Sequence, residues 1–86
     1  MYFVYVLQGR KNGKLYTGFT KDLKTRYRKH KLGGVHTTKR MGEIDLIYYE
    51  AFKAESDARR REKYLKTTKG KRTLRVMLKE SIAAIV

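Results

Sequence analysis

The chain of 86 residues is expected to form one domain, residues 1–86, with a modest core, and its lack of cysteine excludes disulfides and thiolate metal sites. Its formal net charge of +14, from 22 lysines and arginines against 8 aspartates and glutamates, favours a polyanionic partner: DNA, RNA or an anionic membrane surface. The hydrophobic content of 41% argues against disorder, and the lack of a long apolar run or signal peptide predicts a cytoplasmic protein with no membrane segment.

The N-terminal residues predict a β-hairpin. Residues 2–7 are β-branched and aromatic and too few for an ordinary helix, which indicates a strand buried on both faces. The pair Asn12-Gly13 predicts a tight turn, and residues 14–19 return as the second strand. Gly18 lies inside this strand, where glycine weakens strand formation, so we expect another group to approach the backbone closely there.

A first helix is predicted over residues 22–31. Leu23, Tyr27 and His30 recur at positions i, i+4 and i+7, and Arg26 lies on the same side of that helix. The helix therefore presents a histidine and an arginine on the face that carries its apolar residues.

The loop over residues 35–42 is basic and rich in hydroxyl groups. Thr38, Lys39 and Arg40 are of types suited to phosphate contacts, although an ordinary solvated loop is an equally good interpretation. Residues 43–52 are then rich in isoleucine, leucine and tyrosine and predict the third strand.

A carboxylate lies on the apolar stripe of the next predicted helix, which is otherwise strongly basic. Ala58, Glu62 and Leu65 share this stripe at helical spacing. A carboxylate that faces a core is costly unless it is paired or binds a metal. The simpler alternative is an ion pair with Arg59 or Lys66 on the same helix.

Gly70 is expected to end that helix as a C-terminal glycine, and one last helix is expected from about Lys71. Its apolar residues recur every three or four positions: Leu74, Met77, Leu78, Ile82 and Ile85. We expect the apolar segment 82–86 to pack on the domain of a monomer, with dimer formation through it as the alternative. The order β-β-α-β-α-α predicts an α+β fold with a small antiparallel or mixed three-stranded sheet flanked by helices.

Most familiar catalytic motifs are absent, including the phosphate-binding loop, the H-E-x-x-H zinc motif and a cysteine nucleophile. Five residues stand out as candidates for acid–base or electrostatic catalysis. They are spread over two strands and two helices: Tyr5, Tyr16, Arg26, His30 and Glu62. Taken singly, each of them also fits ordinary packing or surface charge.

Taken in order, these residues resemble the GIY-YIG endonuclease superfamily, in particular its small single-domain bacterial members. Phe3-Val4-Tyr5 stands where the family has its first tripeptide and Tyr16-Thr17-Gly18 where it has the second, and the tyrosines Tyr5 and Tyr16 are eleven positions apart, as in the family's pattern. Residues 22–26 with His30 resemble the first-helix signature, which ends in a catalytic arginine. Arg61-Glu62-Lys63 resembles the helix that supplies a metal-binding glutamate. The resemblance extends to about residue 78.

The resemblance implies metal-dependent hydrolysis of phosphodiester bonds in DNA. Glu62 would hold one Mg²⁺ or Mn²⁺ ion, and Arg26 would stabilise negative charge on the phosphate in the transition state. Tyr5 would be the general base, with Tyr16 and His30 positioning water or relaying protons; the roles of the two tyrosines could be exchanged.

A phenol is a poor base at neutral pH, so nearby positive charges would have to lower its pKa. These charges would come from Arg26, the metal ion and Lys21 or Lys24, near the start of the first helix. The residues expected to contact nucleic acid are Gly18, Lys21, Lys24, Lys39, Arg40 and Lys66.

Two other hypotheses compete with the nuclease. One is a non-catalytic nucleic-acid-binding module of the same fold, favoured by the charge and by the lack of the asparagine that many relatives carry after the glutamate helix; Asn12 is the only asparagine here. The other is a basic structural protein of a ribonucleoprotein, which would need neither Glu62 nor the paired tyrosines.

Overall fold

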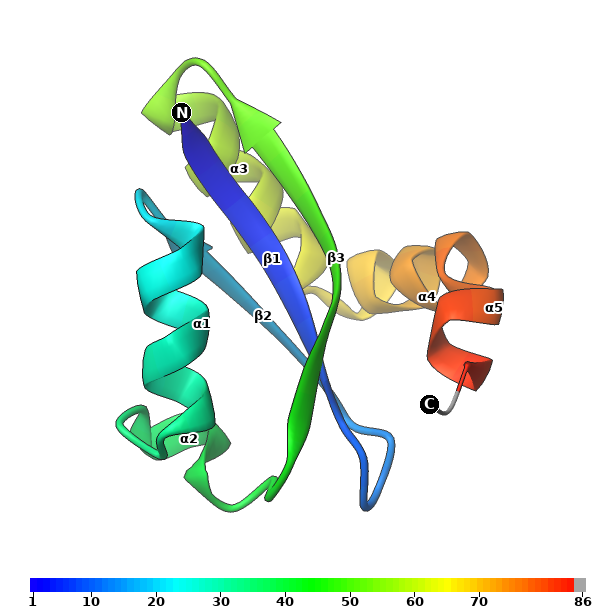
Figure 1. Ribbon diagram of the computed structural model, residues 1–86. Helices are drawn as coiled ribbons and strands as arrows, with labels where there is room; N and C mark the ends of the chain where they lie inside the picture. The colour runs from blue at the N-terminus through cyan, green and yellow to red at the C-terminus, as the bar shows by residue number, and fades with distance from the viewer. Residues whose placement is uncertain (85–86) are drawn as a thin grey trace.

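The fold is a three-stranded antiparallel sheet with helices on both faces (Figure 1), which confirms the predicted α+β class and element order. A computed structural model describes residues 1–84. Strand β1 (Tyr2–Gly9) lies in the middle, between β2 (Leu15–Thr20) and β3 (Ile44–Phe52). Tyr5 pairs with Gly18 on one side and with Tyr49 on the other.

The central position of β1 explains its sequence. Val4, Tyr5, Val6 and Leu7 are all buried, so the prediction of a strand buried on both faces is confirmed. In the turn that follows, Gly13 has a φ of 71°, a conformation that glycine adopts without strain.

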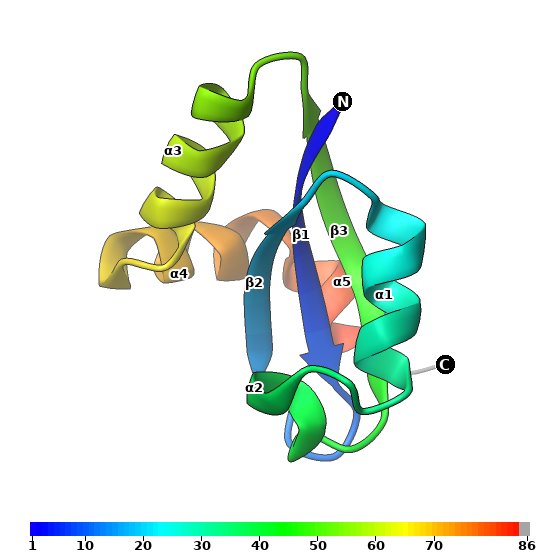
Figure 2. The same cartoon turned by 90° about the vertical axis from the view of Figure 1, so that its left-hand side faces the viewer.

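Helices cover the two faces of the sheet in two groups. Figure 2 shows α1 (Leu23–Lys31) on one side and α3 (Glu55–Leu65) and α4 (Thr68–Met77) on the other. Because side chains alternate along β1, Val4 and Val6 point to the second group of helices and Tyr5 and Leu7 to α1. Tyr5 therefore faces the helix that carries Arg26 and His30.

Local signals explain where the helices begin. Asp22 is the N-cap of α1, and its carboxylate accepts a hydrogen bond from the backbone N–H of Thr25 at 3.1 Å. Helix α3 has no side-chain cap at Ala54, but Glu55 and Asp57 lie in its first turn, where their negative charges interact favourably with the positive end of the helix dipole.

The predicted role of Gly70 was wrong. Helix α3 ends five residues earlier, at Leu65, and Gly70 lies inside α4, whose N-cap is Thr67. A Cβ at Gly70 would overlap the carbonyl of Tyr64 and lie 2.7 Å from the Cα of Leu65. Glycine is needed here because α4 crosses the end of α3 at close range, and this requirement is tertiary.

The single last helix was also wrong. The helix is interrupted at Leu78, whose φ of −107° and ψ of 22° lie outside the helical range. A short helix α5 (Lys79–Ala83) follows. Leu78 is buried in the core, and Ile82 of α5 packs against the same cluster. Met77, expected on the apolar stripe, is 45% exposed.

The C-terminal segment contacts the domain at Ile82. Its side chain packs against the core, and its carbonyl accepts a hydrogen bond from Nε2 of Gln8 at 3.1 Å. Packing on the domain is therefore confirmed for Ile82, while Ile85 and Val86 lie outside the described residues. None of the helices within residues 1–84 is long and apolar enough to cross a membrane.

Candidate active site

A buried hydrogen-bond chain connects β1, α1 and α2 (His36–Lys39). The hydroxyl of Tyr5 lies 2.7 Å from Nε2 of His30, and Nδ1 of His30 lies 2.7 Å from Oγ1 of Thr38. These three residues are 1%, 3% and 1% exposed. The chain is thus shielded from water over most of its length, and each of its polar atoms has a partner.

The far end of this chain determines which ring nitrogen of His30 carries the proton. The hydroxyl of Thr38 donates to the carbonyl of Val35 at 3.4 Å, so its oxygen accepts from Nδ1–H of His30. Nε2 is then unprotonated and accepts the hydrogen bond from the hydroxyl of Tyr5. In this arrangement the phenol points its proton at a histidine that can receive it.

Arg26 lies one helical turn before His30 and contacts the same phenol. Its Nε donates to the hydroxyl of Tyr5 at 3.3 Å. The hydrogen bond to Tyr5 raises the pKa of Arg26, and Tyr16 contributes in the same direction, so both phenols lie close to the guanidinium. Arg26 is only partly buried and can still meet a ligand from solvent.

The environment shifts the pKa values of both Tyr5 and His30. Burial, reinforced by the charge of Arg26, lowers the pKa of His30 to about 4, so the ring is neutral at pH 7. Burial raises the pKa of Tyr5, and the hydrogen bond from Arg26 only partly offsets that rise. The expectation that positive charges lower the pKa of Tyr5 is therefore not met in the protein alone.

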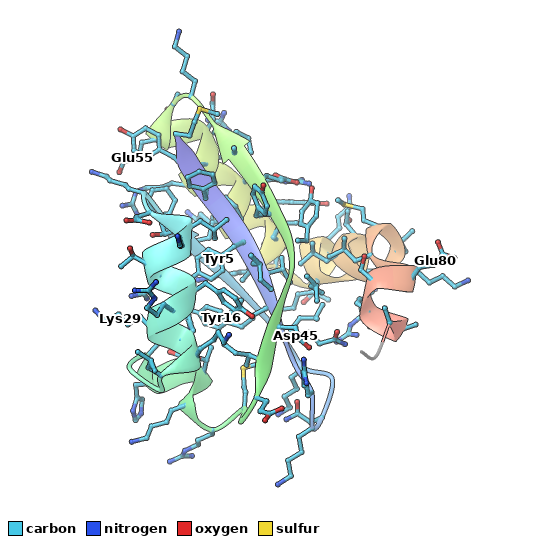
Figure 3. All side chains as sticks on the ribbon, in the orientation of Figure 1. Tyr5, Tyr16, Lys29, Asp45, Glu55 and Glu80 are labelled. Atoms are coloured by element: carbon cyan, nitrogen blue, oxygen red, sulfur yellow. The ribbon has the colours of Figure 1, made fainter. Side chains whose placement is uncertain are left out.

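Tyr16 completes the aromatic wall of this site. Figure 3 shows Tyr5 and Tyr16 together between α1 and the sheet. The ring centre of Tyr16 lies 6.4 Å from that of Tyr5 and 5.2 Å from that of His30. Gly18 leaves the space that the Tyr5 ring occupies, since a Cβ there would overlap the ring. The group expected to approach Gly18 closely is thus Tyr5 itself.

Glu62 lies near this cluster but on another helix. Its carboxylate is among the charges that raise the pKa of Tyr5, after burial and Tyr16. Its side chain is 20% exposed, and one oxygen pairs with Nζ of Lys66 at 3.0 Å. The simpler interpretation, an ion pair on the same helix, therefore describes Glu62 in this structure.

The donor set for a metal ion is small. Within residues 1–84, no three histidine, aspartate or glutamate side chains gather in a way that could hold an ion. One carboxylate still suits Mg²⁺, which usually keeps several waters and is held by one or two carboxylates together with substrate phosphates. Glu62 fits that role if an ion displaces Lys66 from its carboxylate.

The cations expected to contact nucleic acid lie in three places. Lys21 and Lys24 lie at the start of α1, Lys39 and Arg40 at the end of α2, and Lys66 at the end of α3. All five side chains are exposed. Lys66 also lies over the ring of Tyr16, 6.0 Å from its centre, and so connects these cations with the aromatic cluster.

The sequence placed Thr38 in a segment suited to phosphate contacts or, equally well, in an ordinary solvated loop, whereas its side chain is buried against His30. The residue was missed as part of the site because no local pattern relates it to His30, eight positions earlier. The signal available in the sequence was only its residue type within a basic loop.

Comparison with known proteins finds similarity along most of the chain. Residues 1–75 match a family described as the GIY-YIG catalytic domain. Proteins named UPF0213 from Staphylococcus aureus strains Mu3, Mu50 and COL are each 36% identical to this chain over 77 residues, covering 88% of this chain and 93% of the relative. No solved structure was found to match.

Proposed function

The chain belongs to the GIY-YIG family, and we propose that it is a metal-dependent endonuclease that hydrolyses phosphodiester bonds in DNA. One observation carries the proposal. The hydroxyl of Tyr5 contacts both Nε of Arg26 and Nε2 of His30, so a proton acceptor and a fixed positive charge meet at one buried phenol. Packing alone would not require that convergence.

In the proposed reaction, Tyr5 receives the proton of the attacking water. Its own proton moves at the same time to Nε2 of His30, so the phenol never has to exist as a free anion despite its raised pKa. The neutral ring of His30 can accept this proton because Thr38 holds the opposite nitrogen protonated. Tyr16, the more exposed phenol, holds the water in place.

Arg26 binds the scissile phosphate as charge builds on its oxygens. The guanidinium presents several N–H donors in a plane, and only Nε is used by Tyr5. Donors already fixed in position stabilise a charge that develops only in the transition state, without reorganisation during the reaction.

Glu62 would hold the divalent metal ion. A bound Mg²⁺ or Mn²⁺ supplies charge stabilisation for the leaving oxygen and orientation of the phosphate. Lys66, released from Glu62, would then be free to contact the DNA backbone.

A second candidate is a nucleic-acid-binding module without catalysis. It is favoured by the ion pair between Glu62 and Lys66, which satisfies the carboxylate without a metal, and by the missing asparagine after the glutamate helix. This candidate accounts for the charge of the protein but gives no reason for the buried contacts of Tyr5.

Nicking of supercoiled plasmid separates the two candidates. We expect cleavage with Mg²⁺ or Mn²⁺, none with EDTA, and loss of cleavage in Glu62→Gln with DNA binding retained, because the substitution removes the ligand charge and little else. Glu55→Gln on the same helix is the matched control, since Glu55 pairs with Arg59 at the helix start. Equal cleavage by wild type and Glu62→Gln in Mg²⁺ would refute the metal assignment, and no cleavage by wild type would favour the binding module.

A further inference from the structure

A groove of about 460 Å³ runs along the edge of the sheet beside the candidate site. Its wall on one side is β2, an edge strand that pairs only with β1. Its other side is formed by the end of α3 and by α4. Of the site residues described above, Tyr16 and Lys66 line this groove, and its other lining residues have no role in the proposed reaction.

The groove is lined by positive charge. Lys14 lies just before β2, Lys66 at the end of α3, and Lys71 and Arg75 in α4. No carboxylate lines it within the described part of the chain. Apart from Lys66, these cations make no ion pair with any residue from 1 to 84, so their charge is available to an anionic ligand.

The groove also offers apolar surface. Leu15 and the ring of Tyr16, both half-buried, form part of its lining, whereas Leu65 and Leu74, which also border it, are almost fully buried. A track of cations over apolar and aromatic surface is how proteins bind a single nucleic-acid strand, whose bases are free to stack while its phosphates meet the cations. A duplex would present phosphates but keep its base faces hidden.

We propose that this groove holds a single DNA strand that continues from the scissile phosphate at Tyr16. That the bound strand leads to the scissile phosphate rests on the proposed function, but binding of the strand in the groove does not require cleavage. Phosphates contact Lys14, Lys71 and Arg75, and a base or sugar lies against Leu15 and the ring of Tyr16. A volume of this size suits a ligand of one or two nucleotides and is too small for a duplex.

Helix α4 offers a matched pair of variants. Lys71 and Arg75, four residues apart, share the face toward the groove, whereas Lys69 and Arg72 are equally exposed on the same helix but do not line it. Lys71→Ala with Arg75→Ala and Lys69→Ala with Arg72→Ala therefore remove equal charge from one helix. Thermal unfolding checks that both proteins fold.

The test is fluorescence anisotropy in EDTA, with a short labelled single strand and a duplex of the same sequence. We expect the groove pair to weaken single-strand binding by at least ~10-fold, to reduce the salt slope by about 1.4, and to affect the duplex less. The control pair should lower both affinities by similar small factors. Equal effects of the two pairs on the single strand, or an equal loss for duplex and single strand in the groove pair, would overturn the proposal.

Binding in EDTA is independent of catalysis, so the two proposals can fail separately. Loss of single-strand binding without any nicking activity would retain the groove and reject the nuclease. Nicking activity with equal binding by both double variants would retain the nuclease and reject the groove.

Discussion

The properties of the candidate site depend on which atom each side chain meets. Spacing within one helix predicted that Arg26 and His30 share a face, because residues four apart on a helix are neighbours. It could not predict that both reach the same hydroxyl of Tyr5, since that contact depends on how α1 lies on the sheet. Thr38 was missed for the same reason, and its hydrogen bonds to His30 and to the carbonyl of Val35 select the tautomer of His30.

Burial of His30 should make stability depend on pH. Because the pKa of His30 is lowered in the folded protein, the unfolded state binds a proton more readily than the folded state does. The contribution of His30 to stability is therefore full above pH 6.5 and is lost as the pH falls toward 4. We expect the free energy of unfolding to fall by about 2 kcal/mol between pH 7 and pH 5 from this group. Urea unfolding at a series of pH values measures this.

The chain contains two histidines, which supplies the control. His30→Gln should remove most of the pH dependence in this window, whereas His36→Gln, at an exposed position, should retain it. The same pH dependence in both variants would show that His30 is not the titrating group.

At the level of elements, the local patterns predicted the strands and α1 well, but they gave a loop over residues 35–42 where the short helix α2 forms. Tertiary packing decided the rest. Alternating and continuous apolar runs located the three strands within two residues at each end. The break at Leu78 was invisible because the residues on both sides keep an apolar spacing of three and four. Gly70 looked like a helix end because a helix end and a close helix crossing select the same residue.

Gly70→Ala tests whether the helix crossing requires glycine. The added methyl group would overlap the backbone of Tyr64 and Leu65, so α4 would have to move, and we expect a loss of at least about 2 kcal/mol in the free energy of unfolding. Lys69→Ala, one residue earlier and exposed, should change it by less than about 0.5 kcal/mol. Chemical denaturation compares them, and an equally stable Gly70→Ala protein would mean that the two helices are not in fixed contact.

For the molecule as a whole, the net charge predicts the class of partner, a polyanion. The net charge of +14 comes from lysines and arginines in every helix and in the connecting segments, with none in the three strands, so DNA affinity should depend steeply on salt. Contact with roughly four phosphates gives a slope of about −3.6 in log K against log salt for duplex DNA. Titrations at several salt concentrations measure it, and a slope near zero would exclude the positive surface as the binding face.

The central claim is that residues from β1 and α1 act as one catalytic unit. Arg26→Lys keeps the charge but loses the planar donors, and Tyr5→Phe removes only the hydroxyl that Arg26 and His30 share. Each should reduce cleavage by on the order of 10²-fold or more while DNA binding barely changes, because these contacts matter mainly in the transition state.

Single-turnover cleavage by wild type, both single variants and the double variant, at matched metal and salt, tests this claim most directly. Residues that act together are not additive, so we predict that the double variant loses much less activity than the product of the two single losses. Losses that multiply would contradict a shared role at the Tyr5 hydroxyl, and full activity in either single variant would remove that residue from the catalytic unit.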